Sequence, residues 1–201
     1  MRKPRKLRSR KAGLPPSTLV HIGEIKTPSA SYSLIDFDEH GLQETRFAEP
    51  LALTQHACQH ATRWANVYGA SSPTDLATVG SAFGLHPLVQ EDILNNAQRQ
   101  KLDAYEDYLY LVLHRYEIQG NALDLVQDQI SLIIGRDYVL TFQERPSQTF
   151  EPIRQRLRNG HNSLRKGGVD MLAYSLIDTV VDSYCGVIEQ LNDYAEKLED
   201  K

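Results

Sequence analysis

FGLHPLVQEDILNNAQRQK, residues 83–101, combines the start and the end of a helix with two adjacent carboxylates. Pro87 suits the first turn of a helix because its φ is fixed and it has no N–H. Four residues then give the segment one apolar side: Leu88, Val89, Ile93 and Leu94. Asn95 and Asn96 belong to a residue type that tolerates the left-handed backbone at a helix end. The stretch therefore predicts a short helix from Pro87 to about Asn95.

The two acids of this helix, Glu91 and Asp92, are consecutive in the chain. On a helix of 3.6 residues per turn they point about 100° apart, so each is expected to face a different partner. From side-chain chemistry alone, two solvated surface acids are a commoner arrangement than a metal site. Both interpretations stay open at this point.

Strand patterns alternate with helix patterns before this stretch. We expect three strands at residues 18–25, 30–37 and 42–47, a helix at 51–61, a strand at 63–69 and a helix at 72–83. After the stretch, strands are expected at 101–105, 108–119, 123–134 and 138–143, and a helix at 149–159. Short turns containing glycine join the last three strands, which predicts antiparallel neighbours.

Gly167 and Gly168 break the chain before its longest predicted element, a helix over residues 169–200. Its apolar residues recur at spacings of three and four: Leu172, Ala173, Leu176, Val180, Tyr184, Val187, Leu191, Tyr194 and Leu198. The expected fold class is therefore α/β, a mixed sheet sandwiched between helices with a long C-terminal helix. We divide the chain into a flexible basic tail (1–16), an α/β/α domain (17–168) and the long helix (169–201).

Charge is distributed unevenly along the 201 residues, whose formal net charge is −4. Seven basic residues and no acid occur in residues 1–11: Arg2, Lys3, Arg5, Lys6, Arg8, Arg10 and Lys11. Without these seven, 15 basic residues face 26 acidic ones, a net charge of −11. Such an acidic body attracts cations and disfavours nucleic acid as its partner.

Several classes of function find no support in the sequence. It has no phosphate-binding loop, dinucleotide fingerprint, nucleophile elbow or H-E-x-x-H motif, so we expect no enzyme. It has two cysteines without a repeating spacing, no apolar leader and no run of 18 uninterrupted apolar residues, so we expect a soluble chain in a reducing compartment. His56, Cys58 and His60 offer a weak zinc hypothesis, and a helix surface is the simpler explanation.

The order F-G-x-H-P-L-V-x-E-D-I-L, followed by Q-R-x-K, resembles the cytosolic domain of the CorA family of magnesium and cobalt channels. Residues 64–69 are similar to that family's W-x-N-V-x-G strand, residues 128–144 to its central hairpin and residues 150–184 to its later helices. The similarity is collinear from about residue 60 to 200. Gln90 stands where the family usually has an apolar residue and Gln100 where it usually has proline; both are compatible with surface variation.

The resemblance implies roles for particular acids. Asp92 matches an acid at a divalent-ion site between neighbouring subunits, while Glu91 and Asp178 match a second site, and we expect these two to approach each other within one chain. The acid that completes both sites lies beyond Lys201 in the family. Carboxylates suit Mg²⁺, and Asp178 and Asp182, four residues apart on one helix, repel each other without a cation. The implied ligand is Mg²⁺, with Co²⁺ or another divalent cation as alternatives.

In the CorA family two transmembrane helices and a Gly-Met-Asn motif follow the cytosolic domain, and neither occurs here. The resemblance therefore implies a truncated piece of a channel or a natural chain without the pore. It implies a divalent-cation-sensing regulatory domain on the cytoplasmic side of the inner membrane, homopentameric in the full-length channel. The alternatives are a soluble scaffold or nucleic-acid-associated module that uses the basic tail and, within the family, a zinc or proton-coupled transporter.

Overall fold

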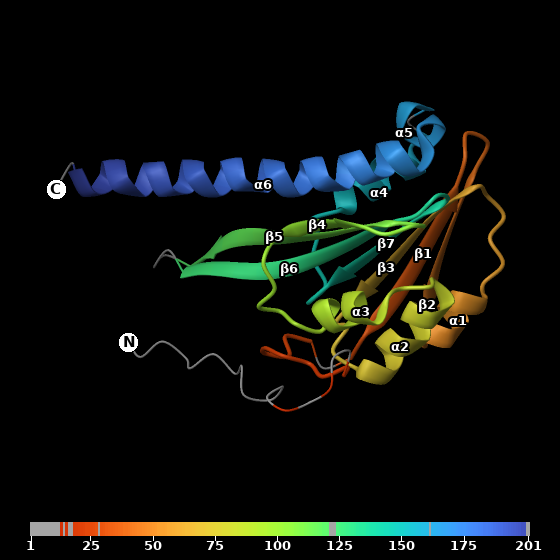
Figure 1. Ribbon diagram of the computed structural model, residues 1–201. Coiled ribbons are helices and arrows are strands. Elements are labelled where there is room, and N and C mark those ends of the chain that lie inside the picture. The colour runs from red at the N-terminus through yellow and green to blue at the C-terminus, as the bar shows by residue number, and fades with distance from the viewer. Residues whose placement is uncertain are drawn as a thin grey trace.

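A seven-stranded sheet with the strand order β2-β1-β3-β7-β6-β5-β4 forms the centre of the molecule (Figure 1). The computed structural model describes residues 13, 15, 18–27, 29–120, 124–160 and 162–199. The strands are β1 (Ser31–Phe37), β2 (Leu42–Phe47), β3 (Thr62–Tyr68), β4 (Lys101–Ala104), β5 (Leu109–Gln119), β6 (Asp124–Ile134) and β7 (Tyr138–Gln143). β3 and β7 pair in parallel and all other neighbours are antiparallel, which confirms the predicted mixed sheet.

Helices cover both faces of this sheet (Figure 1). On one face lie α1 (Pro50–Gln55), α2 (Pro73–Ala82) and α3 (Pro87–Ile93), and on the other α4 (Glu151–Arg158), α5 (Asn162–Lys166) and α6 (Gly168–Glu199). Alternate residues of each strand enter the two cores: Leu34 packs with the first helix layer and Ile35 with the second. The expected fold class is therefore confirmed.

Trp64 shows how the second core layer is built. Its side chain is 1% exposed, its ring meets Phe150 edge-on with centroids 6.0 Å apart, and its indole N–H donates to Thr141 Oγ1 at 3.2 Å. The guanidinium of Arg154 lies 4.9 Å from the ring centroid. Trp64 thereby fixes the start of α4 against the parallel β3–β7 pair at the middle of the sheet.

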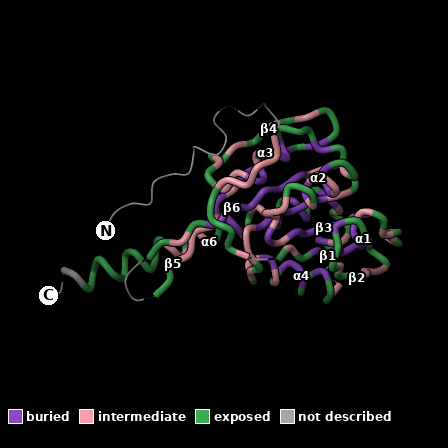
Figure 2. The backbone as a smooth tube through the Cα atoms, turned by 90° about the horizontal axis from the view of Figure 1, so that it is seen from below, coloured by how far each residue is buried: buried purple, intermediate pink, exposed green. Residues whose placement is uncertain are grey.

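The long helix α6 packs against the sheet only along its N-terminal half. Leu172, Leu176 and Val180 are fully buried, and the Tyr184 hydroxyl donates to the His114 carbonyl at 2.6 Å. Farther along, Leu191 is 43% exposed, and in Figure 2 this half of α6 projects from the body. The apolar stripe runs the whole length of α6, but other described residues pack only against its first half.

By length and composition, Gly168–Lys197 within α6 suffices to cross a membrane: one 18-residue window has a mean hydropathy of 1.3, with 28% of it buried. The sequence predicts this helix, but the search for uninterrupted apolar runs did not mark it as long and apolar enough to cross a membrane, because single polar residues interrupt its apolar pattern. Since the N-terminal half of the helix forms part of the core beneath it, we interpret α6 as an element of the folded domain.

Two predicted elements differ from the structure. Residues 18–25 do not form a strand; they make one isolated bridge, between Ile22 and Asn95, because their backbone pairs with the end of α3 instead of a sheet edge. The predicted helix at 51–61 ends at Gln55, so residues 56–60 are not helical. The proposed basic tail lies outside the described residues, apart from Gly13 and Pro15.

Candidate metal centre

The helix α3 begins as its sequence predicts. Pro87 is its first residue, and the His86 side chain caps it by accepting a hydrogen bond from the Leu88 N–H at 3.2 Å. The backbone N–H of His86 donates to the Tyr108 hydroxyl at 2.9 Å, which ties the helix start to the sheet. Val89 and Ile93 then enter the core. The direction of α3, and with it the position of its acids, is set by this start and this packing.

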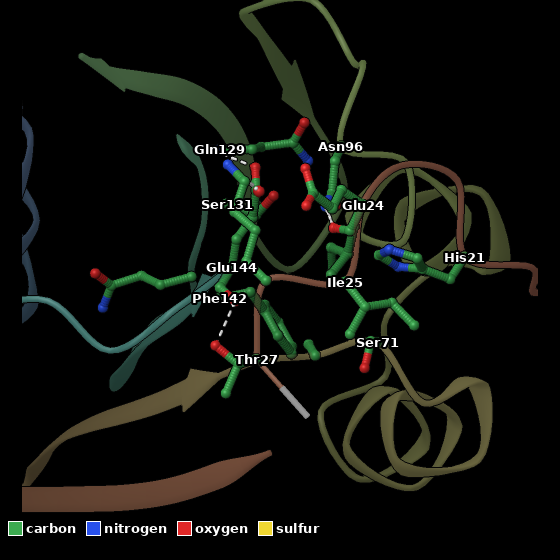
Figure 3. Close-up of a pocket in the computed structure, with 15 residues that line it drawn as sticks. His21, Glu24, Ile25, Thr27, Ser71, Asn96, Gln129, Ser131, Phe142 and Glu144 are labelled. Carbon is green, nitrogen blue, oxygen red and sulfur yellow. Dashed lines mark hydrogen bonds and ion pairs between the residues drawn. The ribbon is translucent and has the colours of Figure 1, made fainter. Parts of the chain in front are cut away.

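The other end of α3 is held by residues 18–27. The Ile22 N–H donates to the Leu94 carbonyl at 2.9 Å, and the Asn96 N–H donates to the Ile22 carbonyl at 3.0 Å. Free carbonyls at a helix end need such partners. Figure 3 shows Glu24, Ile25 and Asn96 side by side at this junction. The segment predicted as a strand thus caps the acidic helix.

Asp92 is the acid of α3 whose partners the structure defines. Its side chain is 19% exposed. One carboxylate oxygen accepts from the Gln98 amide, and the other lies 2.7 Å from the Lys101 ammonium nitrogen. Its backbone carbonyl accepts from Gln129 Nε2 at 3.3 Å. Asp92 is therefore fixed in direction and already faces a cation, the ammonium of its own chain.

Lys101 joins Asp92 to a third acid, Asp103. The ammonium nitrogen lies 2.6 Å from Asp103 Oδ2 and 5.3 Å from the centroid of the Tyr110 ring. Burial alone lowers the pKa of Lys101, but the hydrogen bonds to Asp103 and Asp92 outweigh it and hold the pKa above its ordinary value. Lys101 is therefore charged at neutral pH. This cluster was not predicted from the sequence, although Lys101 and Asp103 are two apart in β4 and therefore share one face of the strand.

Glu91 and Asp178 do not meet within one chain, contrary to prediction. α3 packs on one face of the sheet through Val89 and Ile93, and α6 packs on the opposite face through Leu176 (Figure 1). The sheet therefore separates the two acids. Glu91 is half-buried, whereas Asp178 is exposed on the outer side of α6.

No metal cluster closes within the described part of the chain: no three His, Cys, Asp or Glu side chains there converge to hold an ion. Asp182 is exposed on α6 like Asp178. The zinc hypothesis for His56, Cys58 and His60 is not supported, since these residues are not helical and the His60 ring pairs with Asp38 Oδ2 at 2.9 Å.

Gln90 is not surface variation, as the sequence suggested, but a buried residue. It is 8% exposed, and its Nε2 donates to the Leu85 carbonyl at 2.9 Å. Gly80 of α2 makes room for it, because a Cβ at that position would come within 2.4 Å of Gln90 Cδ. The amide thus packs α3 against α2. Gln100 is exposed, as expected.

A largely buried cluster of charged residues, made of Lys26, Asp128 and Glu144, connects to the Asp92 backbone through Gln129. Gln129, whose amide holds the Asp92 carbonyl, donates its own N–H to Glu144 Oε1 at 2.6 Å. Lys26 bridges Glu144 Oε2 at 2.6 Å and Asp128 Oδ1 at 2.8 Å. Figure 3 shows Gln129 and Glu144 lining a small pocket with Asn96 and Glu24. The backbone of Asp92 is thereby connected to the sheet core and to residues 18–27.

A family model described as a CorA-like Mg²⁺ transporter protein matches residues 59–201. The chain belongs to the CorA-like Mg²⁺ transporter family. It is 36% identical over 197 residues to the cobalt/magnesium transport protein CorA of Thermotoga maritima, covering 96% of this chain and 55% of that protein. It is 31% identical over 133 residues to the magnesium transporter ALR1 of Saccharomyces cerevisiae, covering 65% of this chain and 15% of that protein. This CorA-family chain thus spans about half the length of its bacterial relative.

Solved structures confirm the CorA fold. The soluble domain of CorA from Methanocaldococcus jannaschii superposes with a TM-score of 0.65 at 14% identity, covering 88% of this chain and 65% of that one. The ZntB cytoplasmic domain from Vibrio parahaemolyticus gives a TM-score of 0.55 at 17% identity, covering 83% of this chain and 65% of that one. At these identities the likeness concerns the fold alone.

The donor set around Asp92 fits a hard divalent cation in part. Asp92 and Asp103 offer carboxylate oxygens, the ligands that Mg²⁺ takes while it keeps several waters. Both already contact one cationic nitrogen, so the position between them is suited to positive charge. Two carboxylates do not complete an octahedral shell, which leaves places for water or for groups of another chain.

Proposed function

We propose that this chain is the divalent-cation-sensing regulatory domain of a CorA-type Mg²⁺/Co²⁺ transporter, with Asp92 as its principal ion ligand. Family membership supports the transporter class. The observation that carries the sensing role is the Asp92 carboxylate, which is half-buried, fixed by hydrogen bonds and in contact with a cation.

We assign Glu91 and Asp178 to a second site, formed between copies of the chain. Because the sheet separates the two acids in one chain, an ion that they share must join two chains. The exposed position of Asp178 supports this arrangement, since a neighbour can reach it without unfolding either domain. In the full-length protein this chain is proposed to face the cytoplasm beneath the inner membrane, within a homopentamer.

The mechanism follows from charge. An ion between two copies neutralises carboxylates that otherwise repel one another, so it stabilises the closely packed arrangement. Losing it leaves like charges opposed, and the interface loosens. A ligand shifts such an equilibrium only by its differential affinity for the two arrangements, which here comes from an ion shell completed by the neighbour.

The comparisons give no support to a nucleic-acid module, and the basic residues on which that alternative depends lie outside the described part of the chain. Transporter relatives also agree with the expectation that the chain is not an enzyme. The zinc or proton-coupled alternative differs from our proposal in its ion, so binding measurements distinguish the two.

Melting curves with and without Mg²⁺ test the proposal. We expect Mg²⁺ to raise the thermal midpoint of the wild type, and saturation at 100 times the dissociation constant adds about 2.7 kcal/mol. The gain should fall in Asp92→Ala and, at concentrations where copies associate, in Glu91→Ala and Asp178→Ala. Ionic strength is held constant to remove general screening.

Asp137→Ala is the matched control, because Asp137 is an exposed acid, paired with Arg63, outside both proposed sites. Sedimentation velocity on the same variants measures association, which Mg²⁺ should promote in the wild type but not in Asp178→Ala. Equal Mg²⁺ shifts in all five proteins would remove these acids as ligands.

A further inference from the structure

We propose that Lys101 is a built-in competitor for the divalent cation at Asp92, and that its positive charge sets the affinity of the site. The inference rests on the proposed function, since it concerns the same carboxylate. It adds a residue outside the acids assigned above and a way in which the chain lowers the affinity of the site for the ion.

The geometry places the ammonium where an ion would lie. Lys101 Nζ is 2.7 Å from Asp92 Oδ2 and 2.6 Å from Asp103 Oδ2, so the two oxygens lie no more than 5.3 Å apart. That separation suits a hydrated divalent ion held by both carboxylates. The same Asp92 oxygen cannot contact the ammonium and coordinate an ion at once, so an ion that binds there must displace the ammonium.

The surroundings hold Lys101 in place. Its β4 backbone pairs with β5, where Lys101 lies opposite Val112, and its ammonium lies 5.3 Å from the centroid of the Tyr110 ring. Tyr110 is fully buried. The side chain of Lys101 is 30% exposed, so the ammonium can move into water when an ion arrives. Because its backbone is fixed in the sheet and its ammonium can reach water, Lys101 can act as a reversible counter-ion.

Lys101 also neutralises the charges of Asp92 and Asp103 when no ion is present. Without Lys101, Asp92 and Asp103 would face each other as two uncompensated carboxylates, one of them only 19% exposed. The ammonium removes that repulsion in the ion-free protein. The same contact weakens ion binding, because the ion gains only the difference between its own attraction and that of the ammonium.

The size of the effect follows from Coulomb's law. One positive charge roughly 5 Å from a divalent ion repels it even at the dielectric constant of water, and more strongly in a half-buried site. We therefore expect Lys101→Met to raise the affinity for Mg²⁺ about tenfold or more. Lys101→Gln should do the same, whereas Lys101→Arg should stay within about threefold of the wild type.

Calorimetric titration of Mg²⁺ into the full 201-residue chain provides the test, with far-UV circular dichroism to confirm folding of each variant. Lys166→Met is the matched control, since Lys166 is an exposed lysine of α5, 62% exposed at its side chain, and should not alter the affinity. The higher Mg²⁺ affinity of Lys101→Met must be lost in the double variant Lys101→Met/Asp92→Asn, because the oxygen that Lys101 no longer contacts belongs to Asp92.

The outcomes separate this inference from the proposed function. Mg²⁺ binding that Asp92→Asn abolishes, but that Lys101→Met and Lys101→Gln leave unchanged or weaken, overturns the competition and leaves Asp92 as a ligand. Binding that Asp92→Asn leaves unchanged in both backgrounds overturns both. Absence of binding in the wild type, with binding in Lys101→Met that depends on Asp92, supports the competition but overturns the sensing role proposed for the wild-type chain. Absence of binding in every variant overturns both.

Discussion

Removing Asp128 should destabilise the protein far more than removing an exposed acid that has a single partner. Its side chain is 6% exposed and compensates three cations: it accepts from Lys26 at 2.8 Å, from Arg115 Nη2 at 2.8 Å and from Arg145 Nε at 2.9 Å. Among the residues that the structure describes, Asp128→Ala leaves those cations paired with Glu117 and Glu144.

Breaking a buried ion pair from one side costs about 3–5 kcal/mol. Lys26 and Arg145 are 23% and 28% exposed and regain some hydration, so we expect the lower end, about 3 kcal/mol. For a chain of this size each kcal/mol shifts the thermal midpoint by about 2–4 °C, which gives a decrease of about 6–12 °C.

Urea unfolding at pH 7 and calorimetric melting measure this loss. The matched control is Asp137→Ala, which removes the same side chain from a single pair with Arg63 where Asp137 is 54% exposed. An exposed pair contributes about 0–1 kcal/mol, so the control should melt within about 4 °C of the wild type. Equal decreases in the two variants would refute the claim that burial and multiple partners make Asp128 important.

Three further outcomes follow from the packing and the charges. Burial raises the pKa of Asp128, but the hydrogen bonds to Lys26 and Arg115 outweigh it and lower the pKa below 3.8. The contribution of Asp128 to stability is therefore present above pH 3.8 and is lost as the pH falls through the lowered pKa. Between pH 7 and pH 3, urea unfolding should show a smaller loss of unfolding free energy in Asp128→Asn than in the wild type. Leu176→Ala removes a fully buried side chain of α6 and should cost about 2–5 kcal/mol in the same assay, against less than about 1 kcal/mol for the exposed Leu191→Ala. Gly80→Ala should destabilise the protein by pressing on Gln90, and Gly80→Ala/Gln90→Ala should lose less than the sum of the two single changes, which a double-mutant cycle measures.

The sheet and most helices could be predicted because their signals are local. Alternation of inward and outward residues identifies the strands, Pro87 marks the start of α3, and Gly167 with Gly168 marks the break before α6. Gly168 has φ +55°, a conformation that suits glycine at this junction. Residues 18–25 failed the same reasoning because an apolar extended segment looks alike whether it joins a sheet or caps a helix, and only the folded chain shows the Leu94 carbonyl as its partner.

The candidate site was predicted only in part. Resemblance proposed Asp92 as an ion ligand, but the ammonium of Lys101 and the position of Asp103 depend on how β4 packs beside α3, which neither segment reveals alone. The same limit explains the wrong expectation for Glu91 and Asp178. A family motif assigns two acids to one ion without saying whether one chain or two supply them, and the opposite sheet faces of α3 and α6 support our proposal that two chains do.

Calorimetric titration of Mg²⁺ into the wild type, Asp92→Asn and Asp137→Asn tests the central claim most directly. The substitution keeps the size and a hydrogen-bonding oxygen of the side chain while it removes the charge. The account predicts saturable Mg²⁺ binding in the wild type and in Asp137→Asn, and a loss of at least about tenfold in affinity in Asp92→Asn. The same affinity in all three proteins would contradict Asp92 as the ion ligand.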